Sequence, residues 1–136
     1  MKKLLQVLLA VTLFLSVANA NDFRKIIKIS LKKDVQKKFL VKYAKSERLF
    51  KFRWTLYKNN GLVIFRSYDK KVAQNILYLN HTNQSFRVEL KSRGADFYSV
   101  PYVLVKFKEF DYETREAKFD LFLFDDKMQI ELDELK

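Results

Sequence analysis

The fold of this chain is decided by residues 49–68, which read LFKFRWTLYKNNGLVIFRSY. Two runs rich in aromatic and β-branched residues flank an Asn-Asn-Gly segment, and this arrangement predicts a β-hairpin. We expect Asn60 and Gly61 to form a two-residue turn. The alternation then predicts one core face with Phe50, Phe52, Trp54, Leu56, Val63, Phe65 and Ser67. The opposite face would carry Lys51, Arg53, Thr55, Tyr57, Ile64, Arg66 and Tyr68.

The register of this hairpin matters because a slip of one residue exchanges the two faces of a strand. A three-residue loop would place Trp54 beside Arg66. The two-residue turn keeps the aromatic side chains together on one face, and we therefore prefer it.

Alternation of apolar and polar residues continues on both sides of the hairpin. It predicts further strands at residues 27–31, 72–79, 86–91, 102–110, 117–124 and 128–132. Residues 102–124 form a second predicted hairpin, in which Val103, Val105 and Phe107 lie opposite Phe119, Leu121 and Leu123. This pairing also places Lys108 opposite Asp120. Residues 92–101 form the longest irregular stretch.

Residues 34–45 fit two interpretations. A short helix would begin at Asp34 as the N-cap and present Val35, Phe39 and Tyr43 on one face. A strand would alternate Phe39, Val41 and Tyr43 with lysines, and the β-prone Phe-Leu-Val sequence favours it.

These patterns predict an all-β domain over residues 21–136, built as an antiparallel sandwich or a small closed barrel of eight or nine short strands. The chain has 136 residues, which leaves room for one domain. It contains no cysteine, so its packing forms without disulfides.

Residues 1–20 resemble a secretory signal peptide. Lys2 and Lys3 precede an apolar run over residues 4–17, and Ala18-Asn19-Ala20 fits a cleavage site. The run is shorter than the roughly 20 apolar residues of a membrane-spanning helix. We expect cleavage, export to the periplasm or alternatively full secretion, and no transmembrane segment in the remaining chain.

The chain is strongly basic, with a formal net charge of +11. Residues 21–60 contain 13 Lys and Arg but 3 Asp and Glu, whereas residues 101–136 contain 6 and 10. The positive charge is therefore concentrated in the first third of the exported chain, which favours an anionic partner.

The inventory of reactive side chains argues against catalysis. His81 is the single histidine and follows a predicted strand in a polar turn. With no cysteine to add, the usual zinc ligand sets cannot be assembled. We expect neither a metal nor a cofactor, and we expect no enzymatic activity.

The positive signal is a basic and aromatic surface, for which we select five candidate residues: Lys51, Arg53, Arg66, Tyr68 and Arg87. Arginine beside tyrosine favours binding because the guanidinium forms forked hydrogen bonds and stacks on rings. The sequence thus predicts a binding or accessory module for an anionic envelope component or an acidic protein, with nucleic acid the least expected partner. The alternative is a lipocalin-like carrier of an apolar ligand inside a barrel. A solvated face without a partner would show the same pattern.

Overall fold

The computed structural model describes residues 23–92 and 100–136. Within these ranges the chain forms nine strands: β1 (Lys25–Lys32), β2 (Lys37–Tyr43), β3 (Ser46–Lys58), β4 (Gly61–Tyr68), β5 (Lys71–Tyr78), β6 (Ser85–Glu89), β7 (Tyr102–Asp111), β8 (Glu116–Phe124) and β9 (Glu131–Leu135). The expected signal peptide, residues 1–20, lies outside the described residues, as does most of the predicted irregular stretch.

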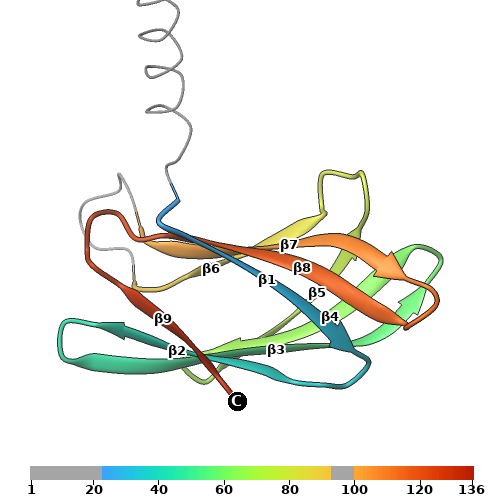
Figure 1. Ribbon diagram of the computed structural model, residues 1–136. Coiled ribbons are helices and arrows are strands. Elements are labelled where there is room, and N and C mark those ends of the chain that lie inside the picture. Colours follow the sequence, from blue (N-terminus) through green and yellow to red (C-terminus); the bar gives the residue numbers. More distant parts are fainter. Residues whose placement is uncertain (1–22, 93–99) are drawn as a thin grey trace, which may run out of the picture.

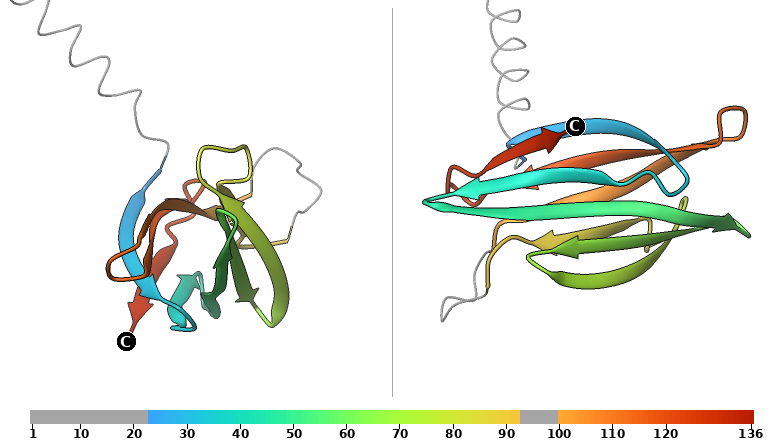
Figure 2. Two further views of the ribbon diagram at one scale, coloured as in Figure 1. Left: turned by 90° about the vertical axis from the view of Figure 1, so that its right-hand side faces the viewer. Right: turned by 90° about the horizontal axis from the view of Figure 1, so that it is seen from below.

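The strands form two antiparallel sheets that pack on one another (Figure 1). One sheet has the order β1-β8-β7-β6 and the other has the order β5-β4-β3-β2-β9. Figure 2 shows the same arrangement from two further directions. The all-β prediction and its sandwich alternative are confirmed, whereas the closed-barrel alternative is wrong because the two sheets do not join into one. No helix suited to crossing a membrane occurs among the residues that the structure describes.

Aromatic side chains fill the space between the sheets. Phe50 and Phe52 of β3 stack with their ring centres 5.7 Å apart, and Phe52 meets Phe119 of β8 edge-on at 5.4 Å. The Trp54 indole N–H donates a 2.7 Å hydrogen bond to the Leu31 carbonyl oxygen on β1. The Trp54 ring is buried, and its N–H has a hydrogen-bond partner. Trp54 therefore joins the two sheets without leaving a buried donor unpaired.

The strand interpretation of residues 34–45 is confirmed over β2. Phe39 and Val41 are fully buried and pair with β3 opposite Phe50 and Arg48. Asp34 lies in the preceding turn with a positive φ of 63°, so the helix alternative is wrong.

The β3–β4 hairpin forms, but its predicted register is wrong for two reasons. The turn residues are Asn59 and Asn60, with φ of 54° and 65°, whereas Gly61 begins β4. In addition, a bulge at Thr55 shifts the register, so that Trp54 lies opposite Ile64. The core side of the hairpin therefore carries Phe50, Phe52, Trp54, Tyr57, Leu62, Ile64, Arg66 and Tyr68.

The β7–β8 hairpin confirms the predicted core face. Val103, Val105 and Phe107 pair with Leu123, Leu121 and Phe119. The predicted backbone pairing of Lys108 with Asp120 is wrong, because Asp120 lies opposite Lys106 and Lys108 falls at a register shift, but the Lys108 ammonium group still lies 3.9 Å from Asp120 Oδ2. The last predicted strand begins later than expected, at Glu131, and forms the β9 edge.

Candidate functional site

The structure divides the five candidate residues among three places. Lys51 and Arg53 lie on the outer face of β3, on the side of the five-stranded sheet that faces away from the core. Arg66 and Tyr68 lie on the inner side of β4. Arg87 lies on β6, in the other sheet. The single surface predicted from the sequence therefore does not form.

Arg66 is engaged within the protein. Its Nε donates a 2.7 Å hydrogen bond to Asn75 Oδ1, and one terminal nitrogen donates to the Arg87 carbonyl oxygen at 3.4 Å. Its guanidinium carbon lies 5.0 Å from the centre of the Phe86 ring, and burial lowers the pKa of the group. Arg66 thus connects the five-stranded sheet to β6 rather than presenting its charge to a partner.

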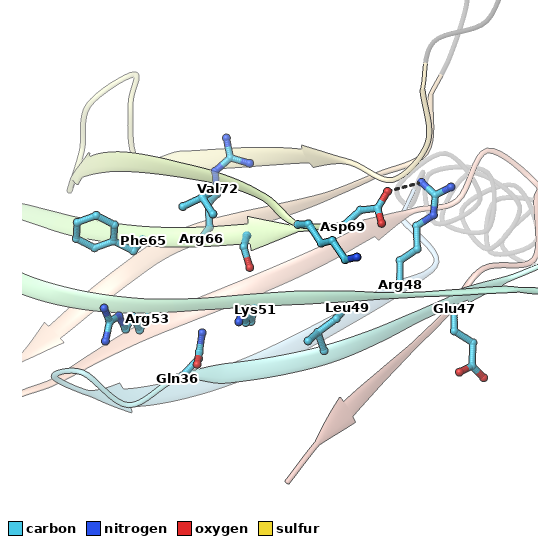
Figure 3. Close-up of a pocket in the computed structure, with 12 residues that line it drawn as sticks. Gln36, Glu47, Arg48, Leu49, Lys51, Arg53, Phe65, Arg66, Asp69 and Val72 are labelled. Carbon is cyan, nitrogen blue, oxygen red and sulfur yellow. Dashed lines mark ion pairs between the residues drawn. The ribbon is translucent and has the colours of Figure 1, made fainter.

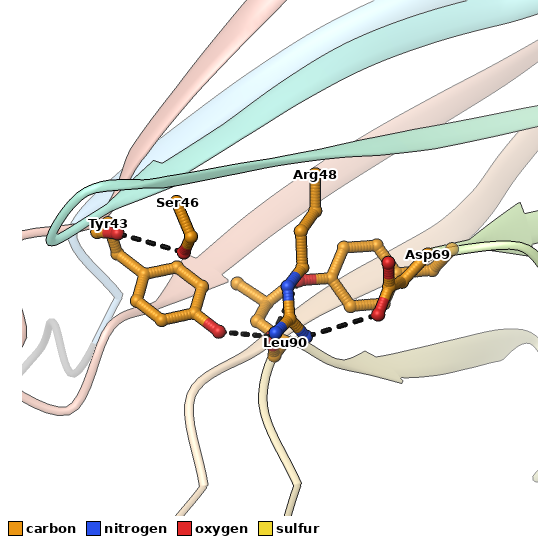
Figure 4. A network of polar contacts seen from close by, with 6 residues as sticks. Tyr43, Ser46, Arg48, Asp69 and Leu90 are labelled. Atoms are coloured by element: carbon orange, nitrogen blue, oxygen red, sulfur yellow. Dashed lines mark hydrogen bonds and ion pairs between the residues drawn. The ribbon is translucent and has the colours of Figure 1, made fainter.

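Tyr68 belongs to a polar network at the end of β4 (Figure 4). Its hydroxyl donates a 2.6 Å hydrogen bond to the Leu90 carbonyl oxygen, which the Tyr43 hydroxyl also approaches at 3.5 Å. Arg48 pairs with Asp69 at 3.3 Å beside them. Burial of the phenol raises the pKa of Tyr68 to about 12, so the residue is a neutral structural donor.

The Arg87 side chain also has partners within the protein. Its guanidinium carbon lies 3.8 Å from the centre of the Tyr102 ring, and one terminal nitrogen lies 4.0 Å from Glu89 Oε1. A cation held over an aromatic face is partly satisfied there. Arg87 therefore stabilises the outer face of the four-stranded sheet.

Lys51 and Arg53 have a different environment, because they line a groove of about 680 Å³ on the outer face of β3, β4 and β5 (Figure 3). We call this the outer groove, and its lining residues are Gln36, Glu47, Arg48, Leu49, Lys51, Arg53, Phe65, Arg66, Ser67, Asp69, Lys70 and Val72. Arg48 pairs with Asp69, and Arg66 is engaged on the inner side of β4. The remaining charged residues are three cations, Lys51, Arg53 and Lys70, and one anion, Glu47, so the groove carries a net positive charge. Within residues 23–92 and 100–136, neither Lys51 nor Arg53 has a side-chain hydrogen bond or ion pair.

Apolar side chains share the outer groove with these cations. Leu49 is 38% exposed, Phe65 is 36% exposed and Val72 is 75% exposed. Sequence reasoning missed all three as site residues and assigned Phe65 to the core. The alternation of β3 alone places Leu49 on the same side as Lys51 and Arg53, whereas the wrong hairpin register concealed the outer position of Phe65. A groove with exposed apolar side chains and unpaired cations is suited to a partner that is both apolar and anionic.

Within residues 23–92 and 100–136, no group of three or more His, Asp or Glu side chains is placed to hold a metal ion. His81 lies in the exposed turn before β6, with its ring 5.8 Å from that of Tyr78. The outer groove is therefore the strongest candidate site.

Comparison with known proteins finds no matching family model, no significantly similar curated protein and no significantly similar solved structure.

Proposed function

We propose that the protein is an exported, non-enzymatic binding module that holds an anionic partner of the cell envelope in the outer groove. The observation that carries this proposal is the position of Lys51 and Arg53, which form no ion pair with any residue that the structure describes and lie beside the exposed apolar residues of the groove. The signal-like residues 1–20 support export, with the periplasm as the proposed compartment and secretion as the alternative.

The physical basis for binding is the combination of charge and apolar contact. A cation without an internal partner can bind an anion without breaking an ion pair, whereas a paired cation must first break its own ion pair. Leu49, Phe65 and Val72 add apolar area that becomes buried at the same time. Arg66, Tyr68 and Arg87 contribute by fixing the framework behind the groove.

A lipocalin-like carrier is not proposed. That alternative needed a ligand cavity inside a closed barrel. The two sheets remain separate, and Phe50, Phe52 and Phe119 are buried between them.

The test uses the full chain produced in a bacterium that has an outer membrane. We expect the wild-type protein in the envelope fraction and its release at about 1 M salt, where the Debye length is about 3 Å. The variant Lys51→Glu/Arg53→Glu should move to the soluble periplasmic fraction while keeping its melting temperature.

A matched control separates the site from net charge. Lys33→Glu/Arg115→Glu makes the same charge change at exposed turn residues beside β1 and β7, and this variant should stay with the envelope. Envelope association of Lys51→Glu/Arg53→Glu at the wild-type level would refute the proposed site, as would equal release of both variants.

A further inference from the structure

β5 forms an edge of the five-stranded sheet, and part of its backbone is open. Two contacts establish which residues face that edge: the Tyr78 N–H donates to the Asn83 carbonyl oxygen, and the Ile76 carbonyl oxygen accepts from Asn83 Nδ2. Backbone groups of alternate residues point to the same side of a strand. The N–H and C=O groups of Val72 and Gln74 therefore also point away from β4, and no hydrogen bond to them occurs on that side within the described residues.

The other three sheet edges are better protected. β6 and β9 have five residues each. β1 has lysines at 25, 28 and 32, and the Lys25 ammonium group caps the Leu132 carbonyl oxygen of the facing edge. Short strands and edge lysines are the usual means of preventing unwanted strand pairing.

β5 has none of this protection along its middle. Its eight residues pair with β4 without a register shift, and it contains no proline. Val72, at 75%, is the most exposed large apolar side chain among the residues that the structure describes. A long, regular and partly apolar edge is a template for an added strand.

On the basis of the proposed function, we propose that the β5 edge accepts an extended acidic segment of a partner protein as an added β-strand beside the outer groove. Main-chain hydrogen bonds to Val72 and Gln74 would hold the segment, and its apolar side chains would pack beside Val72 and Ile76. The partner of the groove is then a protein rather than a lipid or a polysaccharide.

The positive charge beside β5 favours an acidic segment and disfavours a second copy of this chain. Lys70 and Lys71 stand at the start of β5 and form no ion pair within the part of the chain that is described. A second copy would bring the same two lysines together with its own strongly basic residues 21–60. An acidic segment instead supplies carboxylates to these cations and to Lys51 and Arg53 of the adjacent groove.

The test measures binding of the purified exported protein to the peptide acetyl-(Glu-Val)5-amide. In ¹⁵N-labelled protein, we expect the Val72 and Gln74 amides to exchange with deuterium at least tenfold more slowly when the peptide is bound. Gln74→Pro removes the outward donor but leaves the hydrogen bonds to β4, since these come from the odd-numbered residues. This variant should bind at least tenfold more weakly, whereas Gln74→Ala, which keeps the donor, should bind as the wild type does.

Four results would overturn the inference: no peptide binding, unchanged exchange at Val72 and Gln74, equal binding by Gln74→Pro, or equal binding of acetyl-(Lys-Val)5-amide. A dimer that protects the same amides would assign the edge to a second copy and would overturn it as well. If the proline variant does not fold, Gln74→Lys replaces it, because an edge lysine also opposes strand addition.

The envelope experiment distinguishes this inference from the proposed function. If Gln74→Pro stays with the envelope while Lys51→Glu/Arg53→Glu is released, the groove binds without strand addition and the inference alone fails. If the charge-reversed variant also stays, the proposed function fails too.

Discussion

The Tyr68 hydroxyl donates a 2.6 Å hydrogen bond to the Leu90 carbonyl oxygen, and this contact attaches the inner face of β4 to the segment that follows β6. Leu90 is fully buried and its N–H donates to the Pro101 carbonyl oxygen at 2.8 Å. The hydroxyl therefore satisfies a carbonyl at a point where the two sheets meet. It serves the framework, although the sequence presents Tyr68 as part of a binding surface.

Tyr68→Phe should lower the free energy of unfolding by about 1 kcal/mol, the usual contribution of one internal hydrogen bond. The Tyr43 hydroxyl, 3.5 Å from the same oxygen, is too distant to replace the bond fully. Urea unfolding followed by tryptophan fluorescence measures the change. Tyr102→Phe is the control, because its hydroxyl has no hydrogen bond within the described residues, and an equal loss in this variant would contradict the role of Tyr68.

Alkaline pH should destabilise the protein through two tyrosines. Burial raises the pKa of Tyr68 and of Tyr57 to about 12, whereas a tyrosine in the unfolded chain ionises near 10. The folded state thus favours the neutral phenols, so their stabilising effect is complete below pH 10 and is lost as the pH rises to 12. Unfolding free energies measured at several pH values between 9 and 12 should fall accordingly.

The double variant Tyr57→Phe/Tyr68→Phe separates this effect from lysine titration in the same pH range. Its unfolding free energy should fall less steeply with pH than that of the wild type. Parallel curves for the two proteins would show that the tyrosines do not cause the loss.

Removing the side chain should lower the stability of the protein at Arg66 and weaken envelope binding at Arg53. Arg66→Ala breaks the hydrogen bond to Asn75 and the contact with Phe86, and we expect a loss of about 1–2 kcal/mol in unfolding free energy. Arg53→Ala should change stability by less than about 0.5 kcal/mol, because the residue is exposed and unpaired within the described residues. Envelope fractionation of the same variants should show the reverse pattern, with Arg53→Ala the weaker binder.

Local patterns in the sequence predict most of the strands, because the alternation of apolar and polar residues lies within each strand. They also place Phe50, Phe52 and Trp54 correctly on the core side. The relation between neighbouring strands is harder to predict. The bulge at Thr55 has no glycine or proline to mark it, yet it moves Ile64 into the core and Phe65 to the outer face.

The candidate site was affected by the same non-local features. Lys51 and Arg53 follow from the alternation of β3 alone and lie on the outer face as predicted. Arg66 and Tyr68 depended on the register, which the bulge reverses. The position of Arg87 depended on the topology, because the chain passes from one sheet to the other between β5 and β6. No local sequence pattern predicts that crossing.

In the β3–β4 turn, substitutions at two neighbouring residues should change the unfolding free energy in opposite directions. Asn60 has a positive φ of 65° in a two-residue turn, and glycine adopts this conformation without strain, so Asn60→Gly should raise the unfolding free energy by about 0.5 kcal/mol. A methyl group on Gly61 would lie 2.9 Å from Tyr78 Cε1. The Tyr78 ring must then tilt, and Gly61→Ala should cost about 1 kcal/mol. Urea unfolding of both variants measures the two changes, and a loss for Asn60→Gly together with no loss for Gly61→Ala would contradict the turn at residues 59–60 and the close approach of Tyr78 to Gly61.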